Sequence, residues 1–173
     1  MYKIILSIIL LIIFTLGCDS TEPEIETNSD IATIDQNNAG FSFSHGKSVA
    51  IPNNENIIPD FLIAAHTDEN GNVLGVFFGA ESYRPAFCFV KECSQPDSAL
   101  TYFNNLLEVP DSNYLELALP VNPNQIWAVK TSENKYAKIL ILDTEAKFDS
   151  VALNYKTIAK FKWKFQTNGS RTF

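Results

Sequence analysis

Residues 158–166 alternate between apolar side chains and lysines more regularly than any other part of the chain. The apolar positions are Ala159, Phe161, Trp163 and Phe165, and the lysines are Lys160, Lys162 and Lys164. Because successive side chains of a strand point to opposite faces, the pattern predicts a half-buried strand with a solvated lysine face. The lysines could also form an anion-binding patch. We favour a solvent-exposed face, or lysines that protect an edge strand against pairing with another chain.

Shorter apolar segments earlier in the chain predict further strands. We expect them at 41–45, 48–51, 61–67, 73–78, 86–90, 114–119, 126–131 and 136–142. Residues 68–72, Asp-Glu-Asn-Gly-Asn, separate two of these strands and favour a hairpin turn. A tight hairpin loop is also expected at 132–135. These intervals indicate antiparallel pairing between neighbouring strands.

The apolar period changes from two to that of a helix after Cys93. Ala99, Leu100, Phe103, Leu106 and Leu107 would share one helical face. Ser94 and Asp97 have the spacing of a helix cap, Pro96 suits the first turn, and Pro110 stops the helix. The sequence therefore predicts a mostly β fold, an antiparallel sheet or sandwich, with one amphipathic α-helix near 96–108.

The first eighteen residues, MYKIILSIILLIIFTLGC, combine a positive start at Lys3 with an apolar run that is short for a membrane-spanning helix. Gly17 followed by Cys18 resembles the lipobox of bacterial lipoproteins, although Thr15 replaces the usual Leu. We expect residues 1–17 to be a lipoprotein signal peptide and Cys18 to carry the lipid anchor. The alternative is a secreted protein with a free Cys18. The lipid anchor implies a bacterial envelope location, at the outer membrane or cell surface.

Residues 18–40 are polar and acidic, with no sustained period. Such a segment cannot bury a core, so we expect a flexible tether that ends at residue 40, followed by a single domain over 41–173. The early acids could also act as a surface-export signal. The formal net charge is −7, and removing Lys3 with the signal makes it −8. This acidity excludes nucleic acid as an expected partner and leaves Cys18 as the contact with the membrane.

Residues 126–139, IWAVKTSENKYAKI, resemble the strand–turn–strand hairpin of HmuY-type lipoproteins. The FKWKFQTNGS ending and the FSFSHGK segment add fainter similarity, and the resemblance is sharpest over 125–143. It implies a mostly β, surface-tethered protein that binds haem or a small ligand. Family members hold haem iron by two His or two Met in the later part of the domain. This chain has its only Met at position 1 and its two His at positions 45 and 66.

His45 and His66 are the candidate haem or metal ligands. If their strands were antiparallel neighbours with these residues opposed, their Cβ atoms would be about 4.5–5.5 Å apart. That spacing suits two ligands on one side of a small ion but not the axial positions of a haem. The simpler interpretation, which we favour, is hydrogen-bonded His at the border of the core.

Cys88 and Cys93 remain as thiols once Cys18 is lipidated. An oxidising compartment favours a disulfide between them. Structural zinc with the two His is an alternative, but the five-residue spacing differs from the usual CxxC knuckle. Two free thiols are the third alternative.

Catalytic motifs are not evident in the sequence. Ser44 and His45 are adjacent, so on a strand they would point to opposite faces and could not form a nucleophile–base pair. We therefore expect a non-enzymatic binding lipoprotein, HmuY-like in its capture of haem or a small ligand. The alternative is an interaction lipoprotein that contacts host or envelope proteins without a cofactor.

Overall fold

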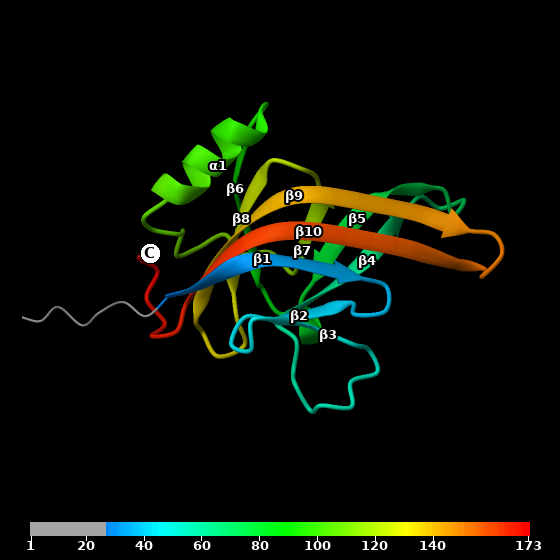
Figure 1. Ribbon diagram of the computed structural model, residues 1–173, viewed down its shortest axis with the longest axis horizontal. Helices are drawn as coiled ribbons and strands as arrows, with labels where there is room; N and C mark the ends of the chain where they lie inside the picture. Colours follow the sequence, from blue (N-terminus) through cyan, green and yellow to red (C-terminus); the bar gives the residue numbers. More distant parts are fainter. Residues whose placement is uncertain (1–26) are drawn as a thin grey trace, which may run out of the picture.

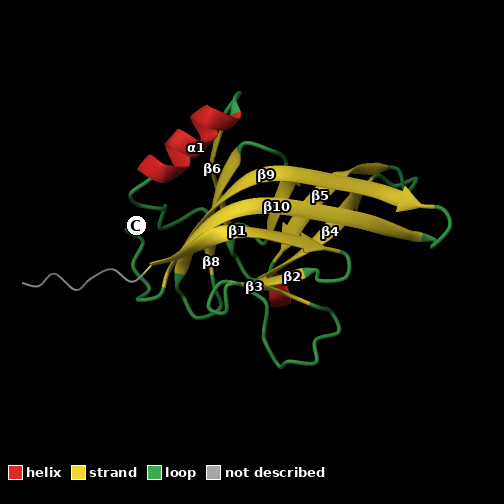
Figure 2. Cartoon of the chain, in the orientation of Figure 1, coloured by secondary structure: helices red, strands yellow, loops and turns green. Residues whose placement is uncertain are grey.

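The computed structural model describes residues 27–173 as two five-stranded antiparallel sheets (Figures 1 and 2). The first sheet has the order β1 (Thr27–Asp35), β10 (Asn154–Gln166), β9 (Tyr136–Asp149), β8 (Gln125–Lys130), β6 (Phe87–Glu92). The second has the order β3 (Lys47–Val49), β2 (Gly40–Ser42), β4 (Phe61–Thr67), β5 (Val73–Gly79), β7 (Leu117–Val121). One α-helix, α1 (Pro96–Asn105), and a 3₁₀ turn, η1 (Glu81–Tyr83), complete the described elements. The predicted fold class is confirmed, and within 27–173 neither helix could cross a bilayer.

Aromatic rings from both sheets form the main core. The ring centroid of Phe41 lies 5.1 Å from that of Phe161 and 5.5 Å from that of Trp163, so the second sheet packs directly on β10. Phe61 and Phe78 extend this contact within the second sheet, with centroids 4.9 Å apart. Each fully buried phenylalanine stabilises the fold by roughly 1.5–3 kcal/mol. The sandwich therefore depends on non-local ring contacts.

The alternation predicted along residues 158–166 is confirmed. The four apolar side chains Ala159, Phe161, Trp163 and Phe165 are buried between the sheets. On the other face Lys160 is exposed, whereas Lys162 and Lys164 are half-buried. The lysine face is thus less exposed to solvent than we expected, because α1 lies near one end of it (Figure 1).

β1 corrects the expected limit of the tether. Residues 27–35 pair with β10 from Thr27 opposite Gln166 to Asp35 opposite Ile158. Ile34 is fully buried and Ala32 packs against the core. A strand added to a sheet gains backbone hydrogen bonds from its partner. Two inward apolar side chains are therefore enough to hold residues 27–35 in the sheet, although their composition alone indicates a tether. The folded unit therefore includes residues 27–40.

α1 packs on the outer face of the first sheet. It begins at Pro96, as predicted, and ends at Asn105, three residues before the expected limit. Gln95 occupies the N-cap position in place of Ser94, and it makes no side-chain capping hydrogen bond. The cluster that joins helix and sheet consists of Ala99, Phe103, Ile126 and Leu140. Burial of this apolar face, more than capping, therefore stabilises the helix.

β2 is shorter than the strand predicted at 41–45. It ends at Ser42, and residues 43–46 form a turn in which Gly46 has a φ of 62°. The amide of Phe43 donates to the carboxylate of Asp60 at 2.8 Å. This turn places Ser44 and His45 in a loop, where the alternation rule for strands does not apply.

The β8–β9 hairpin forms where it was predicted. Its loop is closed by the amide of Thr131, which donates to the carbonyl of Lys135 at 2.9 Å. Asn134 in this loop has a φ of 58°, a conformation that Asn tolerates better than most residues. The strand expected at 114–119 lies instead at Leu117–Val121.

Candidate functional site

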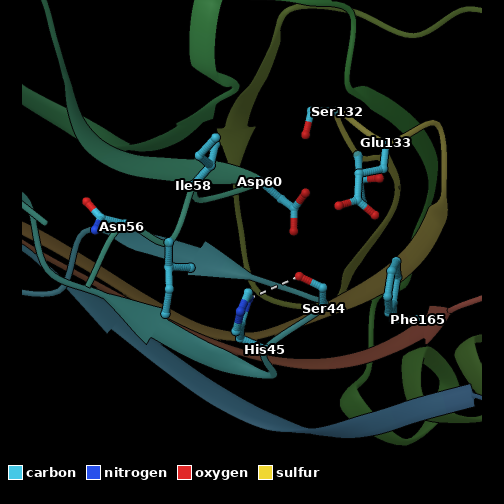
Figure 3. Close-up of a pocket in the computed structure, with 10 residues that line it drawn as sticks. Ser44, His45, Asn56, Ile58, Asp60, Ser132, Glu133 and Phe165 are labelled. Atoms are coloured by element: carbon cyan, nitrogen blue, oxygen red, sulfur yellow. Dashed lines mark hydrogen bonds between the residues drawn. The ribbon is translucent and has the colours of Figure 1, made fainter. Parts of the chain in front are cut away.

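Three loops enclose a cavity of about 210 Å³ beside the end of β10 (Figure 3). They are the turn after β2, the segment that leads into β4, and the β8–β9 loop. The polar residues that line the cavity are Ser44, His45, Asn56, Asp60, Thr131, Ser132 and Glu133. In Figure 3 the side chains of His45, Asp60 and Glu133 lie around the same space. Residues distant in sequence thus form one polar cavity.

His45 is held in the turn by two serines. The hydroxyls of Ser42 and Ser44 each lie 3.1 Å from its Nδ1 atom. The expectation that Ser44 and His45 point apart is therefore wrong, because a turn has replaced the strand. Within residues 27–173 no carboxylate hydrogen-bonds to the His45 ring, so the group that orients the imidazole in a catalytic triad is not in place.

Asp60 is the buried acid of the cavity, with 7% of its surface exposed. Its Oδ2 atom accepts the Phe43 amide at 2.8 Å. Burial raises the pKa of Asp60 from 3.8 to about 6, although the Phe43 amide and the Arg84 charge act in the opposite direction. Oδ1 accepts no hydrogen bond within the described chain and is not fully enclosed by protein. One carboxylate oxygen is therefore free to meet a ligand.

Arg84 joins the loop of Asp60 to the end of β8. Its Nη2 donates to the Asp60 carbonyl at 2.8 Å, and its Nη1 donates to the Lys130 carbonyl. Burial lowers the pKa of this guanidinium, and the charge of Asp60 partly offsets that effect. Because the guanidinium hydrogen-bonds to backbone oxygens, it fixes the cavity wall without neutralising the carboxylate by direct contact.

Glu133 supplies a second carboxylate at the cavity. It forms an ion pair with Lys135 at 2.8 Å, and a hydrogen bond and the charge of Lys135 lower the pKa of Glu133. The side chain is 61% exposed. Glu133 therefore remains ionised at the rim, whereas Asp60 is the more desolvated acid.

His66 does not join His45. Phe41 is opposite Phe61 in the β2–β4 pairing, so the register places position 36 opposite His66, nine residues before His45. The conditional arrangement, in which His45 and His66 are opposed on neighbouring strands, is therefore not present in the described chain. His66 lies instead opposite Gly75, next to a bulge in the β4–β5 pairing.

The residues around the cavity do not fit haem. Sites for ligands of that class are mostly apolar and measure about 300–1,000 Å³, whereas this cavity is smaller and has carboxylates and hydroxyls in its wall. A metal site is also not built, since residues 27–173 hold no group of three His, Cys, Asp or Glu that could bind an ion.

Cys88 and Cys93 are free thiols in the structure, so the expected disulfide is not formed. Cys88 pairs with Ala128, and the Cys93 amide bonds to the Asn124 carbonyl. Gln125, which pairs with the residue before Cys93, lies three extended positions from Ala128, a separation of roughly 10 Å, and this exceeds the Cα separation of a disulfide. The strand thus continues further than the sequence indicated and holds the thiols apart.

The predicted signal peptide at 1–17 and the lipidation site Cys18 lie outside the described residues.

Among the residues of the cavity, the sequence pattern indicated His45 but not Asp60, Glu133 or Arg84. The position of Asp60 between Pro59 and an apolar strand was a weak local signal, since an acid there usually faces solvent. Glu133 and Arg84 gave no signal, because only the packing of separate loops brings them to this cavity.

Comparison with solved structures finds a distant similarity of fold to the crystal structure of the apo HmuY analog (TFO) of Tannerella forsythia. The two share 13% sequence identity with a TM-score of 0.45, over 84% of this chain and 100% of that chain. No family model matches the sequence. No curated protein matches it. At this level the likeness carries no argument about ligand or function.

Proposed function

We propose that this protein is a non-enzymatic binding protein, held at the bacterial envelope through Cys18, that captures a small polar ligand bearing a positively charged group. The ligand would occupy the cavity of Asp60, His45 and Glu133. The lipobox-like sequence at Gly17–Cys18 supports the anchor, and the acid-lined cavity supports the class of ligand.

The buried carboxylate of Asp60 is the observation that carries the proposal. A desolvated carboxylate costs free energy unless a partner compensates its charge. Asp60 receives one amide hydrogen bond, and the guanidinium of Arg84, whose charge lowers the pKa of Asp60, donates its hydrogen bonds to backbone carbonyls. A ligand ammonium or guanidinium at Oδ1 would supply the missing charge-assisted hydrogen bond.

The size and rim of the cavity narrow the class of ligand. About 210 Å³ accommodates a small molecule, and Ser132 and Thr131 provide polar groups beside the acids. Phe165 provides an apolar wall at the same site. A planar cation that combines an apolar edge with several donors suits this mixture, and guanidinium compounds have that chemistry.

Calorimetric titration of the full chain with methylguanidinium chloride, and with methylurea as its neutral analogue, tests the proposal. We expect methylguanidinium to bind and methylurea to bind at least about tenfold more weakly, since the difference is one charge-assisted contact. Asp60→Asn should abolish this preference. Glu55→Gln, which removes an exposed acid in the neighbouring loop, is the matched control and should leave it unchanged. Equal dissociation constants for the two compounds, or no binding of either, would refute the proposal.

A haemin titration of the same preparation examines the HmuY-like interpretation. We expect no sharpened Soret band, because the cavity does not fit a porphyrin. A Soret band that weakens in His45→Ala would overturn the small-cation proposal in favour of haem capture. If neither haemin nor the cation binds, an interaction lipoprotein without a cofactor becomes the better account.

A further inference from the structure

A second cavity lies on the opposite face of the first sheet and is lined by lysines. It measures about 220 Å³ and is bordered by Phe103, Asn104, Lys138, Lys162 and Lys164. Phe103 and Asn104 come from the last turn of α1, and the lysines come from β9 and β10. Because β10 side chains alternate, these lysines point away from Phe165 and the Asp60 cavity.

Lys138 is the buried member of this group, with 1% of its surface exposed. Its Nζ donates to the carbonyls of Phe103 and Leu106 at 2.8 and 2.6 Å. The rings of Phe103 and Phe173 lie 4.9 and 5.0 Å from the same atom. Burial and the charge of Lys164 lower the pKa of Lys138 to about 8. The carbonyls at the helix end thus fix Lys138 but provide only partial negative charge.

Among residues 27–173 no acidic group forms an ion pair with the lysines of the cavity. Lys164 is directly opposite Lys138 on the neighbouring strand, an arrangement in which like charges destabilise a sheet. Within residues 27–173 neither of these lysines, nor Lys162, forms an ion pair. The exposed Lys160 on the same face also forms no ion pair, but its register partner is the acidic Asp143 and not a second lysine. Three lysines without an ion pair are therefore gathered around one cavity.

We propose that the cavity of Lys138, Lys162 and Lys164 is an anion-binding site that takes a phosphate-sized oxyanion. The oxyanion would be free phosphate or the terminal phosphate of a small ester. Lys162 and Lys164 are half-buried and can donate directly, the Asn104 amide offers a further donor, and the held charge of Lys138 strengthens attraction at the inner side. The site is independent of the Asp60 cavity, and its ligand has the opposite charge.

Titration of the full chain at low ionic strength with inorganic phosphate, and separately with glycerol 3-phosphate, tests this site. We expect saturable binding and changes in the NMR amide signals of Asn104 and Lys138. Lys164→Gln should raise the dissociation constant roughly tenfold or more, since it removes a charge-assisted hydrogen bond. Lys160→Gln removes the same charge from the same strand outside the cavity and should change the constant less than about twofold.

Tighter binding of glycerol 3-phosphate than of phosphate would identify an ester as the ligand, and the reverse would identify the free anion. Equal weakening by Lys164→Gln and Lys160→Gln would overturn the proposal, because it would indicate general charge attraction. Absence of binding by the unaltered chain would overturn it as well. Thermal unfolding of both variants checks that each remains folded.

Discussion

Replacement of Asp60 by Asn should separate stability from ligand binding. The Asn side-chain oxygen can still accept the Phe43 amide, which the carboxylate now accepts at 2.8 Å. The substitution removes the buried negative charge while preserving the shape of the side chain. We therefore expect Asp60→Asn to fold, to be at least as stable as the original protein near neutral pH, and to lose selectivity for cationic ligands.

The magnitude follows from the pKa of Asp60, which burial raises from 3.8 to about 6. Each pKa unit corresponds to about 1.4 kcal/mol, so the shift corresponds to about 3 kcal/mol at most. Because the folded pKa is the higher one, the folded state binds more protons between these two values. This contribution to stability is fully present below pH 3.8 and is lost as the pH rises through about 6.

Urea unfolding of both proteins, from about pH 4 to pH 7, measures the effect. The quantity of interest is the difference in free energy of unfolding between the two, since groups common to both cancel. We expect the original protein to lose up to about 3 kcal/mol relative to Asp60→Asn over this range. Glu55→Gln, whose exposed carboxylate pairs with Lys47, should show a difference below about 1 kcal/mol. A pH-independent difference for Asp60→Asn would refute a desolvated carboxylate and remove the basis of the binding proposal.

Three further outcomes are expected. Phe161→Ala should lower the free energy of unfolding by about 3–5 kcal/mol, measured in urea, because its ring is fully buried between the sheets; a loss below about 1 kcal/mol would contradict this packing. Cys18→Ala should abolish palmitate labelling and move the protein out of the detergent phase in a partition assay, and a variant that still labels and partitions as before would disprove the lipid anchor. In the native protein Cys93 should alkylate faster than Cys88, because burial raises the pKa of the Cys88 thiol. The intact mass should be the same with and without reductant. A gain of two hydrogens on reduction would show that Cys88 and Cys93 do form a disulfide.

Local periodicity was sufficient for most of the regular elements. Regular patterns extend over several residues in the alternation of β10, the strands of the β8–β9 hairpin and the apolar face of α1. Many side chains therefore indicate the same type of element at each place. Short segments were less informative. Residues 41–45 alternate as a strand does, yet a single non-local acceptor, Asp60, turns the chain after Ser42.

The amino-acid sequence by itself determined the mostly β class, the positions of the long strands, the helix and the lipobox-like segment, because each is encoded by neighbours in the chain. Only the tertiary structure decided that residues 27–35 complete a sheet, that Asp60 and Glu133 share a cavity with His45, and that Lys138 is buried beside Lys164. The physical reason is that burial, desolvation and like-charge contact arise between segments far apart in sequence. A carboxylate or an ammonium has the same local signature on a wet face as in a cavity, and its surroundings become defined only when the sheets pack.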